Sequence, residues 1–593
     1  MLNILEKLWI GLKPADARQQ HVITNVRYPI TALGFAVAFS PALWLALSWL
    51  PATLYQSAFH PMGYDSFYHA ARILDIAADP SSLYEFDPKI HAPEGSWLTW
   101  PWAYDYLLGL TLSVVDLANR AQWLASVPLL ILAVNCLTFA MLAMRTVADR
   151  WIALTACLAY GLSPLTLNLH GAGMLDHHNI EHWFWMATLL AVMSWRSQPK
   201  NMWIAITCGA LAGMASAFHN GLFIVQLPLV LYVLSQRYFG GQLDQRACLA
   251  MAASLFLTQL LVLLPTSALM QATYHFHTLS WFHLHSAAVS AVAIAFASSR
   301  RMGKWRETLI WVAMALIALP LATEFSHGMS FVSASFPQLT AVTETQSPFG
   351  LTASTALPPA QATSLYSGLL WLWPVAFTFA LWCLIFRPSL RAFALWACLG
   401  LVLLATQYRL FYFGLPFLIL LPAMQASQVF QKMRARVYLL ALLVVCYVPC
   451  YWVLSNPPKP GMDARYLTAL PVIQALSAAC KQEPGIVLAT PGWGHVLRYA
   501  TECSVIANYF IMTPLHAEKI ARVNELMQMH SANIGTEPEA IGYVLVSADS
   551  SAPLGQELLS HTPQGWSILA EAKGMLDRPV VRAFRLTADT RLD

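Results

Sequence analysis

Charged residues are scarce in this chain, and that scarcity excludes a single soluble domain. Asp, Glu, Lys and Arg make up 11% of the 593 residues, whereas soluble domains carry roughly 25%. Hydrophobic residues make up 57%, and the mean hydropathy is +0.53. The composition therefore predicts an α-helical polytopic membrane protein. The net charge of +4 is too small and too dispersed to indicate nucleic-acid binding.

A cleavable signal peptide is also missing from the start of the sequence. Residues 1–28 are polar, lack an apolar core and include the basic residues Lys7, Lys13, Arg18 and Arg27. We expect this segment to be a cytoplasmic leader. Internal repeats and disordered tracts are not evident in the rest of the sequence.

Apolar stretches long enough to cross a hydrocarbon core of about 30 Å recur along the chain, although a few are short. They predict about 13 transmembrane helices within a membrane domain at residues 29–455. The stretches are 29–50, 123–144, 151–169, 178–195, 202–218, 220–238, 247–268, 284–299, 308–325, 364–386, 392–407, 409–427 and 437–455.

Residues 103–118 are also apolar, but Asp105 and Asp116 bracket them. Counting them as a span would reverse the side of every later loop. With this segment left outside as a helix, every second connection is basic, as the positive-inside rule requires of cytoplasmic loops. These connections carry Arg145, Arg150, Arg196, Lys200, Arg237, Arg246, Arg300, Arg301, Lys304, Arg306, Arg387, Arg391, Lys432, Arg434 and Arg436.

The remaining connections and the tail are expected on the far side of the membrane. Loop 51–122 is punctuated by Pro and aromatic residues, which indicates an ordered, functional loop. Loop 326–363 is rich in Ser, Thr, Pro and Gly, a composition typical of a mobile substrate lid. The tail, 456–593, has the composition of a soluble domain with both strand-like and helical runs. It predicts a small α/β domain outside the membrane.

Eight of the ten cysteines lie in or beside the predicted spans, where we expect them to pack as small apolar side chains. Cys480 and Cys503 fall in the tail. A disulfide between them and two unpaired buried thiols are both consistent with the sequence.

An aspartate, Asp65, follows the first span in a helical register with His69 and Arg72. A carboxylate just outside the bilayer can bind a metal ion or an acceptor group. The alternative is that Asp65 only caps the start of a helix on the membrane surface.

Four histidines and two acids occur within residues 170–182, between the third and fourth predicted spans. Asp176 and His178 lie where a turn enters a helix, and carboxylate oxygen and imidazole are suitable ligands for manganese or zinc. His178 and His182 share a helix face. Hydrogen bonding to lipid headgroups would explain one or two of these histidines but not so dense a group.

Two further residues become candidate site residues because these clusters are present. Glu344 lies within the second long loop, where a lone acid is normally only solvated. Arg409 stands at the outer mouth of a span, where it could reach the headgroups or bind a phosphate of a lipid-linked substrate. If the three loops meet on one side, Asp65, Asp176 with His178, and Glu344 can gather around one divalent cation.

These motifs resemble the catalytic subunit of oligosaccharyltransferase, a member of the C-type glycosyltransferase superfamily, and most closely its single-subunit bacterial and archaeal forms. They occur in the family's order and cover nearly the whole chain. The matching pieces are 65–69 with Arg72, 91–97, 100–106, 176–178 with Glu181, 343–346, and Arg409. The resemblance implies the C-type glycosyltransferase fold in the cell inner (plasma) membrane, with a cytoplasmic N-terminus and an extracytoplasmic active site.

The resemblance also implies the roles of these residues. Asp65, Asp176 and His178 would bind a divalent cation, Mn²⁺ or Mg²⁺, and Glu344 would complete the site. Asp65 and Glu344 would orient and deprotonate the acceptor. Arg409 would bind the donor phosphate, where negative charge accumulates as the bond to sugar C1 breaks.

Two departures from the family's pattern concern the acceptor and the donor. The family's external domain opens with a Trp-Trp-Asp-Tyr-Gly motif that holds the hydroxyl of the acceptor sequon, and here Gly492 stands at the aspartate position. Trp493 and His495 are expected to form the wall of a changed acceptor pocket. An arginine that often precedes the Gly-x-x-Asp turn is replaced by Leu169 and His170.

Together with this resemblance, the sequence predicts a membrane glycosyltransferase that moves a saccharide, with metal assistance, from a polyprenyl-(pyro)phosphate donor to an extracytoplasmic acceptor. The resemblance implies a protein as the most specific acceptor. Because Gly492 lacks a carboxylate, a non-sequon acceptor such as a glycan, a lipid or a protein hydroxyl is the alternative. A transporter or flippase for the same lipid-linked sugar is less favoured, since it would need ionisable residues deep within the spans.

Overall fold

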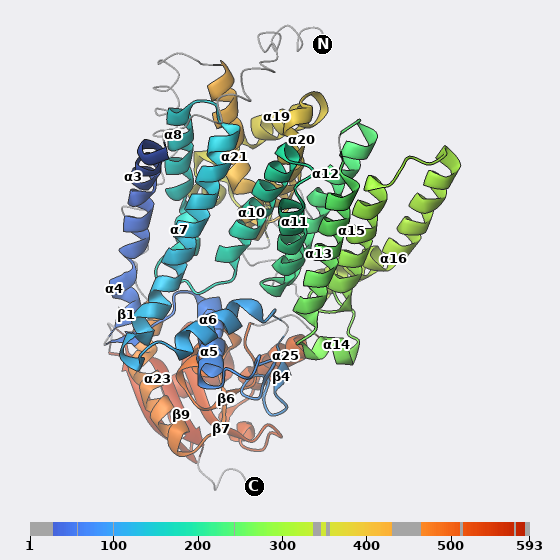
Figure 1. Cartoon of the computed structure of the whole chain (residues 1–593). Coiled ribbons are helices and arrows are strands. Elements are labelled where there is room, and N and C mark those ends of the chain that lie inside the picture. The colour runs from blue at the N-terminus through green and yellow to red at the C-terminus, as the bar shows by residue number, and fades with distance from the viewer. Residues whose placement is uncertain are drawn as a thin grey trace.

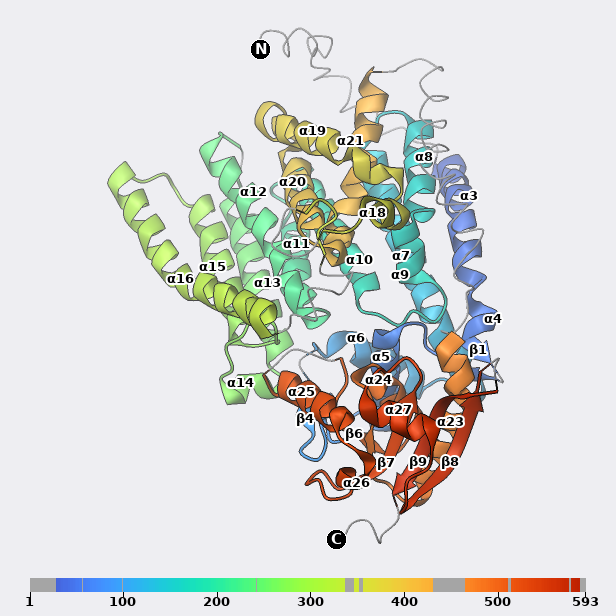
Figure 2. The same cartoon turned by 180° about the vertical axis from the view of Figure 1, so that it is seen from behind.

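Three layers follow one another along the molecule: a helical bundle, a thin layer from the first long loop, and a C-terminal α/β domain (Figures 1 and 2). The computed structural model describes residues 28–55, 57–98, 100–241, 243–335, 346–350, 356–429, 464–509, 514–574 and 577–586. The predicted span 437–455, nearly all of the leader and Glu344 lie outside these ranges.

The bundle consists of apolar helices. In the described ranges, nine are long and apolar enough to cross a membrane, and ten if the bent pair α8 and α9 is one span. Helix α10 starts with polar residues and α11 is short, so neither meets that test. The bundle helices are α3 (Tyr28–Leu47), α7 (Arg120–Thr146), α8 (Arg150–Gly161), α9 (Pro164–His170), α10 (His178–Ser197), α11 (Met202–Met214), α12 (Gln226–Tyr238), α13 (Gln245–Leu263), α15 (Trp281–Ser298), α16 (Lys304–Ser335), α19 (Trp373–Phe386), α20 (Arg391–Thr406) and α21 (Phe411–Val429). The helical polytopic fold is confirmed; the count of thirteen spans is not.

Small residues let neighbouring helices approach closely. A Cβ atom on Gly209 would lie 2.1 Å from the carbonyl oxygen of Met251, and one on Gly213 would lie 2.4 Å from that of Leu255. These two glycines, four residues apart on α11, therefore face the backbone of α13. Such small-residue contacts are the usual way in which membrane helices gain packing energy.

The middle layer is built around α5 (Tyr64–Ala78) and α6 (Ala103–Ser113), with two short strand pairs, β1 (Leu54–Tyr55) with β2 (Ala58–Phe59) and β3 (Phe86–Asp87) with β4 (Ser96–Trp97). Helix α6 has 11 residues, too few to cross a membrane. It lies beside α5, where a Cβ on Gly109 would be 2.5 Å from Ile76 Cγ2. The apolar segment that we expected outside the bundle does lie outside it (Figure 1).

The C-terminal domain has a five-stranded sheet in the order β6-β5-β7-β9-β8. Strand β7 is parallel to β5 and antiparallel to β9, and all seven of its residues are buried. The elements are α23 (Ala464–Gln482), β5 (Ile486–Leu488), α24 (Pro491–Ala500), β6 (Ser504–Val505), α25 (Pro514–Gln528), α26 (Ser531–Ile534), β7 (Ile541–Ser547), α27 (Pro553–Ser560), β8 (Trp566–Lys573) and β9 (Pro579–Leu586). The predicted small α/β domain is thus confirmed.

Of the two states left open for the tail cysteines, the structure has the disulfide. Cys480 of α23 is bonded to Cys503, with a Cα–Cα distance of 5.3 Å. The bond ties α23 to the segment that leads into β6. Disulfides persist in oxidising compartments, which agrees with a domain outside the cytoplasm.

A buried ion-pair cluster fixes the C-terminal domain to the middle layer. Arg498 of α24 donates from Nε to Asp87 Oδ2 at 2.7 Å and from Nη2 to Asp75 Oδ2 at 2.6 Å. The same Nη2 also donates to the hydroxyl of Tyr84 at 2.7 Å. Because Asp75 lies on α5, the cluster sets the position of α24 relative to α5.

Backbone pairing extends this interface. Ala92 N donates to Val505 O at 3.0 Å, and Val505 N donates to Lys89 O at 2.8 Å. Lys519 of α25 donates to Ala92 O at 3.0 Å and also contacts Glu94. The first long loop is therefore held between the bundle and the C-terminal domain.

Candidate metal and donor site

A glycine turn between α9 and α10 positions Asp176. Gly173 has φ +84°, which favours glycine, and a Cβ there would lie 2.4 Å from Thr53 Cγ2. The backbone N of Gly173 donates to Ala125 O, and its backbone O accepts from Met62 N, both at 3.0 Å. The turn is pinned against the start of the middle layer, which presents Asp176 to α5.

Asp176 is buried and orders the start of α10. Its Oδ1 accepts the backbone N–H of His178 at 3.0 Å and lies 3.4 Å from Nδ1 of His177. Both histidines that follow it are therefore held next to its carboxylate.

The histidine that faces this turn is His69 of α5, and it is fixed from behind. His69 Nδ1 is 2.7 Å from Asp105 Oδ1, and Arg72 Nη1 donates to Asp105 Oδ2 at 3.2 Å. All three side chains are buried, with 2% or less exposed. Arg72 also donates to the carbonyl oxygens of Leu83, Trp100 and Pro101 at 3.2 to 3.4 Å.

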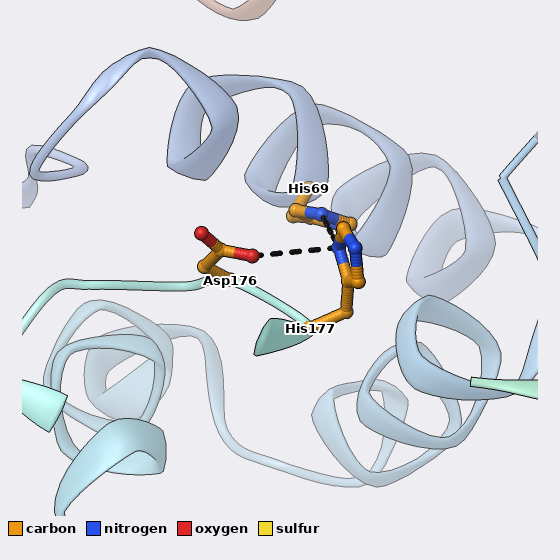
Figure 3. A group of neighbouring side chains, drawn as sticks. All are labelled: His69, Asp176 and His177. Carbon is orange, nitrogen blue, oxygen red and sulfur yellow. Dashed lines mark hydrogen bonds and ion pairs between the residues drawn. The ribbon is translucent and has the colours of Figure 1, made fainter. Parts of the chain in front are cut away.

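His69, Asp176 and His177 form one group (Figure 3). The Nε2 atom of His69 is 2.9 Å from Nδ1 of His177, and one possible ligand atom from each of the three lies within 4.8 Å of the others. Burial lowers the pKa of His69, but Asp105, its hydrogen bond, Asp176 and Asp65 outweigh that effect and the pKa is raised. Burial lowers the pKa of His177, and the neighbouring histidines lower it further.

A second group shares His177 and extends into the bundle. His177, Glu181 and His219 also offer ligand atoms within 4.8 Å of one another. Glu181 Oε1 is 2.6 Å from His178 Nδ1 and 3.2 Å from His219 Nδ1. The ring of Trp100 covers this group, with centroids 4.6 Å from His177 and 5.4 Å from His219. The two groups make a continuous patch of carboxylates and imidazoles.

Of the four predicted metal ligands, Asp176 and His178 contribute to this patch. Asp65 is exposed in the first turn of α5, one turn before His69, and its charge acts on that histidine. The N-cap residue of α5 is Gly63 and the first helical residue is Tyr64, so Asp65 does not cap the helix. His178 belongs to the patch because its Nδ1 atom contacts Glu181 Oε1. Glu344 lies outside the described residues.

Arg409, the predicted phosphate-binding residue, lies at the same end of the bundle. It is exposed in a short helix, η7 (Tyr408–Leu410), and its Nε donates to Gln407 Oε1 at 3.1 Å. Tyr412 lies within electrostatic range of both Arg409 and Glu181, and its ring stacks on His178 with centroids 5.5 Å apart. Tyr412, three residues after Arg409, therefore connects this segment to the acid and histidine patch.

The two predicted acceptor-pocket residues have different surroundings. Trp493 is packed into the core of the C-terminal domain and donates from Nε1 to Ser547 Oγ at 3.1 Å. His495 faces α5, with its ring centroid 6.0 Å from that of Tyr68. Burial lowers the pKa of His495 to about 3, with His69 and His91 adding to the shift, so the side chain is neutral. Of the two, only His495 reaches toward the site.

Sequence reasoning did not assign roles to Asp105, His177 and His219. In the sequence, Asp105 marks one end of an apolar segment and lies within the motif 100–106, and His219 is a single histidine between two apolar stretches. The i, i+4 spacing of Asp65 and His69 was a usable signal for one wall of the patch. The other contacts join segments 36 to 108 residues apart and have no local signature.

The comparisons with known proteins agree with this architecture. No protein-family model matches the chain. A curated relative, dolichyl-phosphooligosaccharide-protein glycotransferase 1 of Archaeoglobus fulgidus, is 24% identical over 125 residues, which are 21% of this chain and 21% of the relative. The matched segment is therefore about a fifth of that relative's length.

Solved structures of the Archaeoglobus fulgidus oligosaccharyltransferase share the fold over most of this chain. The enzyme AglB in complex with an inhibitory peptide and a dolichol-phosphate gives a TM-score of 0.69 at 16% identity, covering 88% of this chain and 69% of that one. A complex with Zn and sulfate gives a TM-score of 0.62 at 17% identity, with 87% and 67% covered. The form tethered to a peptide with an NVT sequon gives 0.67 at 16% identity, with 94% and 74% covered. This chain therefore has the fold of the archaeal oligosaccharyltransferase over most of its length, and it is similar in sequence to an archaeal glycotransferase over a segment of 125 residues.

Proposed function

We propose that this protein is a membrane glycosyltransferase that transfers a saccharide from a polyprenyl-(pyro)phosphate donor to an acceptor outside the cytoplasm. The observation that supports the proposal is the gathering of Asp176 and Glu181 with four histidines at one end of the bundle, close in sequence to Arg409 through its neighbour Tyr412. These residues come from four segments that are distant in the sequence. Relatives of the same fold were solved with a dolichol-phosphate and with an acceptor peptide, which supports this donor and acceptor class.

The residues of the patch fit a divalent cation. Carboxylate and imidazole ligands suit manganese or zinc, whereas magnesium prefers oxygen ligands alone. His177 Nε2 is buried with no hydrogen-bond partner in the described part of the chain. One relative was solved with Zn. We propose that Asp65, Asp176, His178 and Glu344 hold the cation, with Mn²⁺ favoured over Mg²⁺, and that it stabilises the negative charge of the leaving phosphate.

The chain's own side chains would carry out the remaining steps. The exposed carboxylate of Asp65 can accept the proton of the acceptor N–H or O–H as that atom attacks sugar C1. Arg409 would hold the phosphate oxygens while the bond from C1 to the phosphate oxygen breaks. Direct displacement of this kind inverts the configuration at C1.

The acceptor and the orientation are parts of the same proposal. The bundle end with the patch and the C-terminal domain would face away from the cytoplasm, because the basic connections predicted to be cytoplasmic follow the other helix ends.

Gly492 supplies no carboxylate for a sequon hydroxyl, so both a sequon peptide and another glycan, lipid or protein acceptor must be tested. His495, next to α5, is the pocket residue best placed to contact an acceptor.

A labelled polyprenyl-linked saccharide tests the proposal. Membranes that contain the full-length protein should move the label to peptide, lipid or polymer, and Asp65→Asn should stop that transfer. Asp116→Asn is the matched control, because Asp116 is an exposed acid of the same loop that makes no side-chain cap bond. Transfer that survives Asp65→Asn at the wild-type rate would contradict the assignment of the site.

A further inference from the structure

We propose that His69 is a nitrogen ligand of the divalent cation, and that the buried Asp105 and Arg72 are positioning residues that aim it. This inference rests on the proposed function, since it concerns the same cation. It adds a ligand from α5 that the sequence motifs did not indicate. It also assigns a role to a buried acid and a buried arginine.

The first step of the argument is the tautomer of His69. A carboxylate only accepts, so Nδ1 of His69, 2.7 Å from Asp105 Oδ1, carries the hydrogen. In the neutral ring the lone pair is then on Nε2. A carboxylate behind one ring nitrogen is the usual partner of a histidine that binds a metal through the other nitrogen.

The second step is the position of Nε2. It lies 2.9 Å from His177 Nδ1, which in turn is 3.4 Å from Asp176 Oδ1. Ligand atoms that bind one ion at about 2.0 to 2.2 Å are separated by distances in this range. Possible ligand atoms of His69, Asp176 and His177 lie within 4.8 Å of one another between α5 and the α9–α10 turn (Figure 3).

The third step is the reason for burying Asp105. A wholly buried carboxylate is costly unless it is paired and hydrogen-bonded. Its two oxygens are divided between His69 and Arg72, so the acid both neutralises Arg72 and orients His69. Arg72 in turn bonds the carbonyls of residues 100 and 101, the turn that holds Trp100 over His177. The ion pair of Asp105 and Arg72 therefore fixes both His69 and the turn that carries Trp100.

A purely structural role for this ion pair makes a different prediction. If Asp105 and Arg72 only joined α5 to α6, losing the His69 ring would leave the nitrogen ligands of the bound ion unchanged. The ligand set itself must therefore be measured, with the cation alone and without any donor or acceptor.

Mn²⁺ titration of the full-length, metal-stripped protein in detergent provides that measurement. Free Mn²⁺ read by electron paramagnetic resonance gives the affinity, and pulsed spectra give the coupling to ligand ¹⁴N nuclei. We expect His69→Gln to remove one ¹⁴N coupling and to weaken binding about 10- to 100-fold, and Asp105→Asn to weaken it about 10-fold. His561→Gln, which removes an exposed histidine far from the patch, should change neither value.

His69→Gln keeps the Asp105 and Arg72 pair, so it remains informative if Asp105→Asn does not fold. Unchanged affinity together with an unchanged ¹⁴N spectrum in folded His69→Gln would overturn the inference, whereas the proposed function would still stand. A wild-type protein that transfers no saccharide would overturn the proposed function without altering this test.

Discussion

Helix α5 presents two different polar surfaces to its neighbours. Toward the C-terminal domain, Asp75 pairs with Arg498, and Asp87 completes that cluster. Toward the bundle, His69 meets a turn that brings an acid and more histidines. On one surface two aspartates share the guanidinium of Arg498, and the other surface gathers acids and imidazoles.

The difference separates a docking surface from a binding surface. The ion pairs of Arg498 with the two aspartates hold two parts of the molecule in one arrangement. In the patch, the buried guanidinium of Arg72 is already shared among Asp105 and several carbonyl oxygens. The remaining acids and imidazoles can therefore take a further positive charge. We therefore expect substitutions on the two surfaces to affect different measurements.

The largest contrast should come from Asp176→Asn against Asp75→Asn. The first removes a carboxylate from the patch and should lower the transfer rate roughly 1,000-fold, as losses of charge-stabilising groups do. The second leaves Arg498 bonded to Asp87 and Tyr84, so the rate should stay within a few-fold. Initial rates with a labelled lipid-linked saccharide make the comparison; equal losses in both variants would erase the distinction between the two surfaces.

Arg498→Met should affect stability on the docking surface. It leaves two aspartates unpaired at a buried interface, a change that costs about 3 kcal/mol. We expect a lower melting temperature and faster proteolysis at the junction of the C-terminal domain.

The triple variant with Asp75→Asn and Asp87→Asn is its control. Removing all three charges should recover most of the loss, because no uncompensated charge remains. If the triple variant were as unstable as Arg498→Met, the ion pairs would not be the reason for the effect.

Low pH should destabilise the interface between the middle layer and the C-terminal domain. Burial lowers the pKa of His91 to about 4, with Lys519 adding to the shift, and its ring packs on His516 with centroids 4.3 Å apart. The unfolded chain takes up the proton near pH 6.5 but the folded chain does not, so stability is full above pH 6.5 and falls between about 6.5 and 4. The expected loss at pH 5 is about 2 kcal/mol.

Melting temperatures of wild type and His91→Phe between pH 7 and pH 5 measure this effect. The variant should show a smaller decrease, because it has no proton to take up at that position. A decrease of the same size in both proteins would assign the pH dependence to other groups.

The smallest effect is expected from Gly492→Asp, which restores the family's carboxylate. A Cβ there would be 3.4 Å from Tyr509 Cε2, an ordinary contact. We expect stability within about 0.5 kcal/mol of wild type and a gain of about fivefold in transfer to an Asn-x-Thr peptide, the size of one hydrogen bond.

Gly494→Asp is the matched control for that variant. A Cβ on Gly494 would lie 2.3 Å from Ala507 O and 2.6 Å from Asn508 Cβ, so this change should unfold the region around α24. A gain with an Asn→Gln peptide as well would show that the new acid does not act through the sequon.

Sequence patterns predicted the general architecture because they report local composition. Low charge and long apolar stretches indicated a helical membrane domain, and the soluble composition of the tail indicated an α/β domain. The positive-inside rule placed residues 103–118 outside the bundle, and α6 lies there. The count of spans was less secure, since the polar start of α10 and the short α11 blur the hydropathy pattern.

The candidate site was only partly predictable. Asp176 and the dense histidine segment stand out within thirteen residues, and Asp65 gains meaning from its position after a span. The roles of Asp105 and His219 depend on contacts across 36 and 38 residues of sequence, with His69 and Glu181 respectively. No local pattern encodes such contacts.

The sequence by itself determined that this chain is a helical membrane protein with acids and histidines in its outer loops, because hydropathy and charge are properties of each segment alone. Only the tertiary structure decided which of those side chains meet. The α9–α10 turn, held by Gly173 against the middle layer, brings Asp176 and His177 to His69. The burial of Asp105 and Arg72 then fixes which nitrogen of His69 faces the patch.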